Sequence, residues 1–165
     1  KNRLIALIPA RSGSERIKNK NIINFYGKPL IYYSITSSLK SSIFDKIIVS
    51  TDSEKYSKIA LKYGATDVIK RPKKISGDKS TDYQALIHAI KSLKFLNFDL
   101  NAHIRPTTPI RKVKEIDKAI LLFSKGKYTS SKKGSFFFVR REPGLLIPKR
   151  HFVSATIQLY TGYNN

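Results

Sequence analysis

The chain of 165 residues has no cysteine, no methionine and no tryptophan, and only 11 acidic residues stand against 32 lysines and arginines. Without cysteine there is no disulfide framework, no thiolate nucleophile and no cysteine-based zinc site. No apolar run reaches the roughly 20 residues that cross a bilayer, and residues 4–8 are too short for the core of a signal peptide. We therefore expect a cytoplasmic protein without a membrane span.

The absence of methionine, together with the first residue Lys1, leads us to expect that the sequence is incomplete. The basic stretch 125–133 and the end at Asn165 are the expected places for missing segments. The length predicts a single domain over residues 1–165 with one core. We find no internal repeat and no linker that divides it.

The formal net charge of +21 is large enough to attract polyanions. One interpretation is a phosphate-bearing ligand, and another is a compositional bias shared by a whole proteome. A nucleic-acid-binding module is a third, but it predicts aromatic residues interleaved with cations on one face. Most phenylalanines and tyrosines here fall at core-periodic positions, so nucleic acid is the less favoured partner.

Strand-like and helix-like segments alternate along the chain, which predicts an α/β fold with a mainly parallel sheet between two layers of helices. Residues 4–9 form a continuous apolar run, typical of a buried parallel strand. Further strands are expected at 44–50, 67–70, 100–104, 135–139 and 154–160. Helices are expected at 30–41 with Pro29 at the first helical position, after 51–53 with Gly64 as the C′ residue, from 80–82 to 93, and around 113–123.

Ligands of such sheets bind outside the carboxyl ends of the strands, where residues 11–21 form the first polar loop. This loop combines a glycine with four cations, and consecutive N–H groups with Arg or Lys suit phosphate oxygens. It lacks the glycine pattern of a P-loop and of a dinucleotide fingerprint. Taken alone, the loop fits a triphosphate site or a basic solvated turn.

Three further polar segments follow later strands. Arg71 fits a phosphate contact. Ser80 and Asp82 fit recognition of a base edge, or one of them simply caps the helix. The loop 105–111 carries two arginines and two threonines between prolines, which fits a clamp for a carboxylate or merely a stiffened turn. His88 and His103 fall among core positions and His151 has no partner at metal spacing, so no zinc site is predicted.

Five motifs in register resemble the acylneuraminate cytidylyltransferase family over roughly residues 4–123. They are Ile8-Pro9-Ala10-Arg11-Ser12-Gly13-Ser14 with Lys20-Asn21, Val49-Ser50-Thr51-Asp52, Arg71-Pro72, Gly77-Asp78, and Arg105-Pro106-Thr107-Thr108-Pro109-Ile110-Arg111. The resemblance implies a Rossmann-like nucleotidyltransferase fold, a homodimer, and the substrates CTP and an acidic sugar. It implies transfer of CMP to a nine-carbon sugar acid with release of pyrophosphate, assisted by Mg²⁺.

The resemblance also implies roles for individual residues. Arg11 and Lys20 would be catalytic. The implied CTP-binding residues are Ala10, Arg11, Gly13, Ser14, Arg16, Lys20, Asn21, Arg71, Ser80 and Asp82. The implied sugar-binding residues are Arg105, Thr107, Thr108 and Arg111.

The chain departs from the family pattern at three places. Glu15 stands where relatives usually have lysine. Arg105 replaces the glutamine of typical sialic-acid enzymes. No acidic residue follows Glu142, so the late Asp-x-Asp pair that binds the metal has no counterpart and the metal ligands are unknown. A synthetase for CMP-Kdo and a homologue that binds nucleotide without catalysis therefore stay open as alternatives.

Overall fold

A computed structural model describes residues 3–14, 16–77, 79–93, 100–124, 136–140 and 158–160. Its main sheet has six strands in the order β5-β4-β1-β6-β7-β8. Strands β1, β4, β5 and β6 are mutually parallel, and β7 runs antiparallel to β6. These strands are β1 (Leu4–Pro9), β4 (Lys46–Thr51), β5 (Asp67–Lys70), β6 (Leu100–Ile104), β7 (Phe136–Arg140) and β8 (Gln158–Tyr160).

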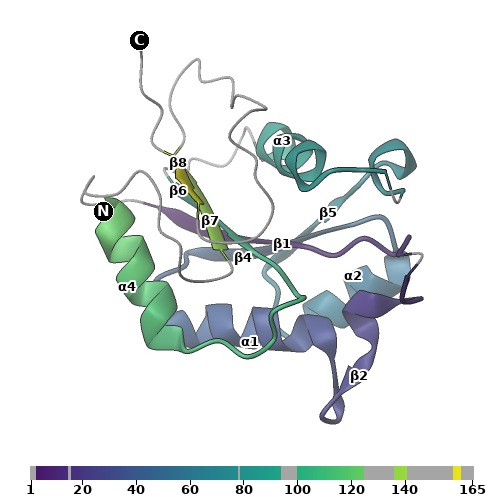
Figure 1. Ribbon diagram of the computed structural model, residues 1–165, viewed down its shortest axis with the longest axis horizontal. Coiled ribbons are helices and arrows are strands. Elements are labelled where there is room, and N and C mark those ends of the chain that lie inside the picture. Colours follow the sequence, from purple (N-terminus) through teal and green to yellow (C-terminus); the bar gives the residue numbers. More distant parts are fainter. Residues whose placement is uncertain are drawn as a thin grey trace.

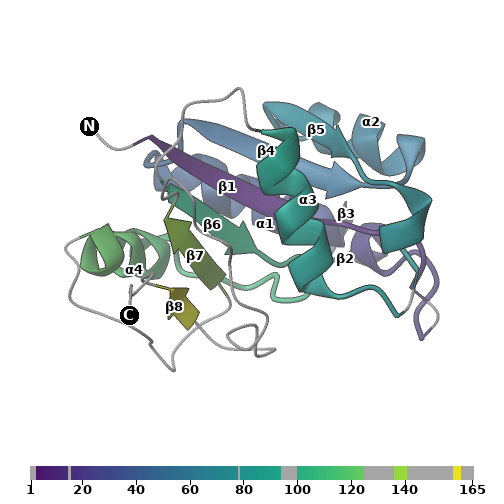
Figure 2. The ribbon, with the colours of Figure 1, turned by 90° about the horizontal axis from the view of Figure 1, so that it is seen from above.

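Helices cover both faces of the sheet, as Figure 1 shows. One face carries α1 (Leu30–Ser41), α2 (Glu54–Lys62) and α4 (Val113–Ser124), and the other carries α3 (Asp82–Ser92). Seen from above in Figure 2, α3 lies across the strands. The predicted three-layer α/β class with a mainly parallel sheet is therefore confirmed.

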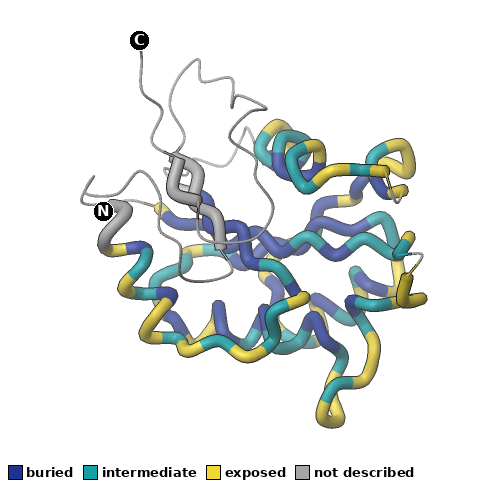
Figure 3. Tube along the Cα trace, viewed as in Figure 1, coloured by how far each residue is buried: buried dark blue, intermediate teal, exposed yellow. Residues whose placement is uncertain are grey.

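The burial of β1 explains its uninterrupted apolar sequence. Leu4, Ala6 and Ile8 belong to the core cluster with α1, α2 and α4, whereas Ile5 and Leu7 belong to the cluster under α3. Both faces of the strand are thus removed from water, as in other parallel sheets. The central strands are accordingly the most buried part of the tube in Figure 3.

Several predicted boundaries differ from the structure by one or two residues. The strand expected at 44–50 is β4 at Lys46–Thr51. Pro29 is the N-cap of α1, not its first helical residue, because its ψ of 143° is extended. The strand expected at 135–139 is Phe136–Arg140. Of the strand expected at 154–160, Gln158–Tyr160 is seen, and 154–157 and the stretch 125–133 lie outside the described residues.

The sequence patterns did not predict three small elements, one of which is the 3-10 helix η2 (Lys73–Ile75). Lys20–Ile22 form the 3-10 helix η1, and β2 (Asn24–Phe25) pairs with β3 (Lys28–Pro29) in a short hairpin. Tyr26 and Gly27 at its turn have φ angles of 47° and 78°, the left-handed pair of a type I′ turn. Figure 1 shows this hairpin projecting from the helical layer beside α1.

Candidate active-site cleft

A cavity of about 270 Å³ opens at the carboxyl ends of the parallel strands. Its walls come from segments that follow β1, β5 and β6 and from the start of α3. The lining residues are Pro9, Arg11, Ser14, Lys20, Asn21, Arg71, Ser80, Thr81, Asp82, Arg105, Pro106 and Thr107. Of the described residues, four cationic side chains and one carboxylate line the cavity, which favours an anionic ligand.

The first wall is the first loop, residues 10–21, of which residue 15 lies outside the described part. The Ala10 N–H donates to the Ser50 carbonyl at 2.9 Å, and the buried Asn21 side chain donates to the Arg11 carbonyl at 2.9 Å. Both ends of the loop are thereby fixed beside the sheet. Arg11, Ser14, Lys20 and Asn21 line the cavity, whereas Ala10 is buried beneath it.

Position 13 requires a glycine because backbone of another segment lies close to it. A Cβ placed on Gly13 would lie 2.9 Å from the carbonyl oxygen of Ser76, inside any normal contact distance. Arg11 also donates from Nη1 to the carbonyl of the next residue, Gly77. The lack of a side chain at Gly13 lets the first loop pack on the segment after β5. Gly13 and the exposed Arg16 do not line the cavity.

The second wall contains Arg71, which is only 4% exposed. Its Nε donates to Ser50 Oγ at 3.2 Å and its Nη2 donates to the Ser50 carbonyl at 3.1 Å. Burial lowers the pKa of Arg71 to about 10, and Asp52 opposes this shift by favouring the charged form. Arg71 is therefore a cation held at a fixed place in the cleft wall.

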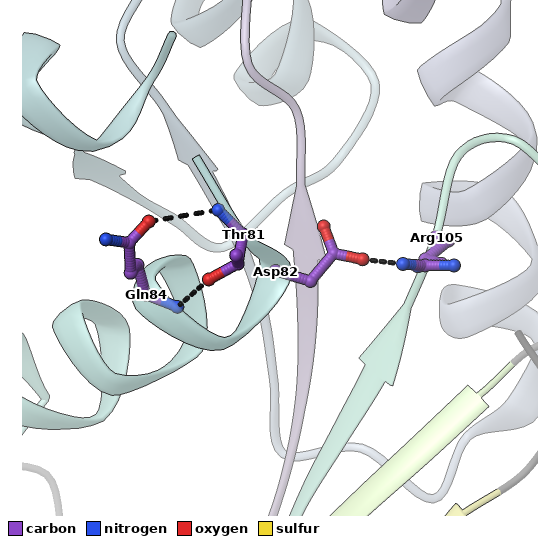
Figure 4. Close-up of polar contacts among 4 residues, drawn as sticks. All are labelled: Thr81, Asp82, Gln84 and Arg105. Atoms are coloured by element: carbon purple, nitrogen blue, oxygen red, sulfur yellow. Dashed lines mark hydrogen bonds and ion pairs between the residues drawn. The ribbon is translucent and has the colours of Figure 1, made fainter. Parts of the chain in front are cut away.

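The start of α3 shows which residue caps the helix, a role that the sequence left open between Ser80 and Asp82. The cap is Thr81, whose hydroxyl accepts from the Gln84 N–H at 3.2 Å while Gln84 Oε1 accepts from the Thr81 N–H at 3.0 Å. Figure 4 shows this capping box and Asp82 pointing away from it toward Arg105. Neither Ser80 nor Asp82 caps the helix, and both line the cavity.

The third wall is the arginine loop, residues 105–111, in which the two arginines differ in position. Arg105 lines the cavity and forms an ion pair with Asp82, whereas Arg111 lies outside the lining. Arg111 Nη1 donates to Ser34 Oγ at 2.9 Å, and Arg111 Nη2 donates to the Arg105 carbonyl. Burial lowers the pKa of Arg111 to about 10. Arg111 thus ties the loop to α1; Thr107 lines the cavity and Thr108 does not.

The two histidines of the described part lie near the cleft without lining it. His103 is fully buried in β6, and burial, followed by the charges of Arg71 and Arg111, lowers its pKa to about 3. Burial and Arg71 also lower the pKa of His88. Both are consistent with neutral packing residues.

Sequence reasoning gave no role to several residues of the cleft. Pro9, Thr81 and Pro106 line it, and Asp52 binds Ser12 at its base. Asp52 carries a usable signal, because a carboxylate directly after a buried parallel strand lies at the ligand-binding edge. Thr81 was detectable from the spacing to Gln84, which matches a capping box.

Solved structures share this fold at low sequence identity. A CMP:2-keto-3-deoxy-manno-octonic acid synthetase complexed with CTP aligns with a TM-score of 0.63 and 16% identity, over 78% of this chain and 50% of that one. A 4-diphosphocytidyl-2C-methyl-D-erythritol synthase aligns with a TM-score of 0.58 and 15% identity, over 96% and 69%. The fold is that of the Rossmann-like nucleotidyltransferases.

Sequence comparison then defines the family. The cytidylyltransferase family model matches residues 5–142, and the chain belongs to this family. It is 39% identical over 123 residues to an N-acylneuraminate cytidylyltransferase of Escherichia coli, covering 74% of this chain and 29% of that protein. It is 37% identical over 158 residues to a pseudaminic acid cytidylyltransferase of Campylobacter jejuni, covering 94% and 66%. The chain thus spans from under a third to about two thirds of these relatives.

No helix of the described residues combines the length and the apolar character that a membrane crossing needs.

Proposed function

We propose that the protein transfers CMP from CTP to a nine-carbon acidic sugar and releases pyrophosphate. The observation that carries the proposal is one cavity lined by cations of both the first loop and the arginine loop, so that a polyphosphate and a carboxylate can each meet cations in the same cleft. Relatives named for N-acylneuraminate, pseudaminic acid and N,N′-diacetyllegionaminic acid support the acceptor class.

In the proposed reaction the anomeric hydroxyl oxygen of the sugar attacks the α-phosphorus of CTP. A new oxygen–phosphorus bond forms, the bond to the β-phosphate oxygen breaks, and the hydroxyl proton passes to solvent. Such transfers depend mainly on alignment and on neutralising the phosphate charge. Arg11 and Lys20, both in the cleft lining, are the proposed catalytic cations, and no side chain needs to act as a nucleophile.

The remaining lining residues divide between the two substrates. Ser14, Asn21 and Arg71 are proposed to bind the triphosphate, and Ser80 and Asp82 the cytosine and ribose, because of their places on the first two walls and at α3. Arg105 and Thr107 are proposed to bind the sugar acid. Of the residues outside the lining, Ala10, Gly13 and Arg16 are proposed to contribute to CTP binding, and Thr108 and Arg111 to sugar binding.

A divalent metal, proposed as Mg²⁺, fits this class of reaction. No group of three metal-ligating side chains is found among the residues that the structure describes. The two carboxylates at the cleft are engaged, Asp52 with Ser12 and Asp82 with Arg105. The described residues therefore do not fit a metal site on their own.

A cytoplasmic location and a homodimer are also proposed. The lack of cysteine in the sequence fits a reducing compartment. Light scattering of the full-length protein tests the dimer, and a monomeric mass would exclude it.

The decisive experiment measures pyrophosphate release from CTP and Mg²⁺ by the full-length protein with four acceptors: N-acetylneuraminate, pseudaminate, N,N′-diacetyllegionaminate and the eight-carbon acid Kdo. We expect turnover with a nine-carbon acid, whereas a preference for Kdo would move the protein to the rival acceptor class. Arg11→Ala and Lys20→Ala should each lower kcat/KM by at least about 100-fold.

Lys18→Ala is the matched control, because it removes the same charge from an exposed position of the first loop. Its kcat/KM should stay within about threefold of wild type, since isolated surface charges contribute little. Equal losses in all three variants would indicate a general charge effect and would remove Arg11 and Lys20 from the catalytic role.

A further inference from the structure

The ion pair between Asp82 and Arg105 joins two walls of the cleft. Asp82 is the first residue of α3, and Arg105 directly follows β6. Both side chains remain partly open to the cavity, with relative exposures of 33% for Asp82 and 24% for Arg105. In Figure 4 the two side chains point toward each other.

Among the residues that the structure describes, Asp82 is the single carboxylate in a lining that holds Arg11, Lys20, Arg71 and Arg105. A guanidinium binds a carboxylate through charge-assisted hydrogen bonds, and its geometry suits one such group well. Burial lowers the pKa of Arg105, which indicates that its charge has lost part of its hydration. A partner carboxylate compensates that loss, and in this structure the partner belongs to the protein itself.

We infer that Asp82 is a specificity-determining residue that occupies the carboxylate position of Arg105 and competes there with the carboxylate of the acceptor. This inference rests on the proposed function, because it assigns Arg105 to the acceptor. An incoming sugar acid replaces the carboxylate of Asp82 at Arg105 with its own. Its binding free energy is therefore the favourable contact with Arg105 less the cost of separating Asp82 from Arg105. Every acid pays the same displacement cost, so only an acid that makes further contacts in the cleft binds tightly.

The displaced Asp82 finds a partner in the nucleotide. A ribose hydroxyl donates to a carboxylate, and Asp82 stands on the wall proposed for cytosine and ribose. CTP then draws Asp82 from Arg105 and raises the affinity of the sugar acid. Linkage requires that the acid raise the affinity of CTP by the same factor.

Calorimetric binding to the full-length protein in EDTA tests this without turnover. The ligands are CTP, pseudaminate and N-acetylneuraminate. We expect Asp82→Asn to bind a sugar acid about tenfold more tightly than wild type when CTP is absent, in line with the coupling of close charge pairs. CTP should strengthen acid binding to wild type severalfold and leave acid binding to Asp82→Asn nearly unchanged.

Two controls separate the contact from a general charge effect. Glu54→Gln removes the same charge from the first position of α2, far from Arg105 in the sequence and also next to a serine or threonine cap. It should leave acid binding unchanged. In an Arg105→Gln background, Asp82→Asn should also have no effect, because the competed partner is gone.

The outcomes distinguish the inference from the proposed function. CTP binding by wild type with equal or weaker acid binding by Asp82→Asn would overturn the inference alone. The same holds if Asp82→Asn strengthens acid binding equally in the Arg105→Gln background. Absence of pyrophosphate release from CTP and Mg²⁺ with all four acceptors would overturn the proposed function and the inference with it.

Discussion

Asp52 accepts two hydrogen bonds from Ser12, from its backbone N–H at 2.8 Å and from its hydroxyl at 2.6 Å. Asp52 directly follows β4, and Ser12 belongs to the first loop after β1. One carboxylate therefore fixes the loop that carries Arg11 to the neighbouring strand. Asp52 also favours the charged form of Arg71 and so raises its pKa against the effect of burial.

Asp52→Ala should lower the free energy of unfolding by about 1–3 kcal/mol, because it leaves the Ser12 donors without their acceptor. It should also weaken CTP binding about tenfold, since the first loop loses its anchor. Ser12→Ala removes one of the two bonds and should cost about half as much stability. Urea unfolding measures the free energy of unfolding, and CTP titration measures the affinity for CTP. If the stability losses of Asp52→Ala and Ser12→Ala were fully additive in the double variant, the result would contradict a direct interaction between the two residues.

Gly13→Ala should destabilise the protein by about 1–3 kcal/mol, because the added Cβ meets backbone and not a side chain that can move. The displaced loop should also bind CTP more weakly. Gly77→Ala is the matched control, since a Cβ there meets nothing within 4 Å. Thermal unfolding of the two variants provides the comparison, and equal melting temperatures would refute close packing of Gly13 on Ser76.

Arg111→Ala and Ser34→Ala should each raise the KM for the sugar acid more than the KM for CTP, because both loosen the arginine loop and leave the first loop intact. Their stability effects should couple by about 1 kcal/mol in a double-mutant cycle. Lys112→Ala, which removes the neighbouring exposed cation, should change neither the KM values nor the free energy of unfolding. A larger effect on CTP than on the acid would place Arg111 with the nucleotide.

His103 should make the protein sensitive to mild acid. Its folded pKa of about 3 lies below the ordinary 6.5, so its contribution to stability is complete above pH 6.5 and is lost as the pH falls toward 3. From pH 8 to pH 5 the loss should be about 2 kcal/mol. Urea unfolding of His103→Gln should show a correspondingly flatter pH dependence.

A comparison with His88 makes the acid prediction specific. His88 shifts in the same direction as His103, so His88→Asn should retain most of the slope. The cations that favour neutral His103 are Arg71 and Arg111. An unchanged slope in His103→Gln would show that other groups cause the acid sensitivity.

The sequence predicted the elements whose burial pattern is local. The bounds of β1 and α1 were obtained because a strand buried on both faces and a helix with one apolar face each leave a clear periodicity. The hairpin with Tyr26 at its turn was missed, since two-residue strands carry no periodicity. The antiparallel direction of β7 depends on its pairing with β6, which spacing alone does not encode.

The site residues also divide into those whose place follows from the local sequence and those whose place depends on tertiary contacts. Most of the residues proposed from the first loop and from the segments around 71 and 80–82 do line one cavity, because the carboxyl ends of parallel strands meet at one edge. The positions of Gly13 and Arg111 were not predictable in this way. Both are set by tertiary neighbours, Ser76 and Ser34, that are distant in the sequence.

Each wall of the cleft extends from a different strand, with the first loop after β1, Arg71 after β5 and the arginine loop after β6. Loops on a rigid scaffold tolerate exchange better than the scaffold itself. The loop after β6 can therefore change, and with it the proposed acceptor contact, while the loops after β1 and β5 keep their sequence and their place in the cleft.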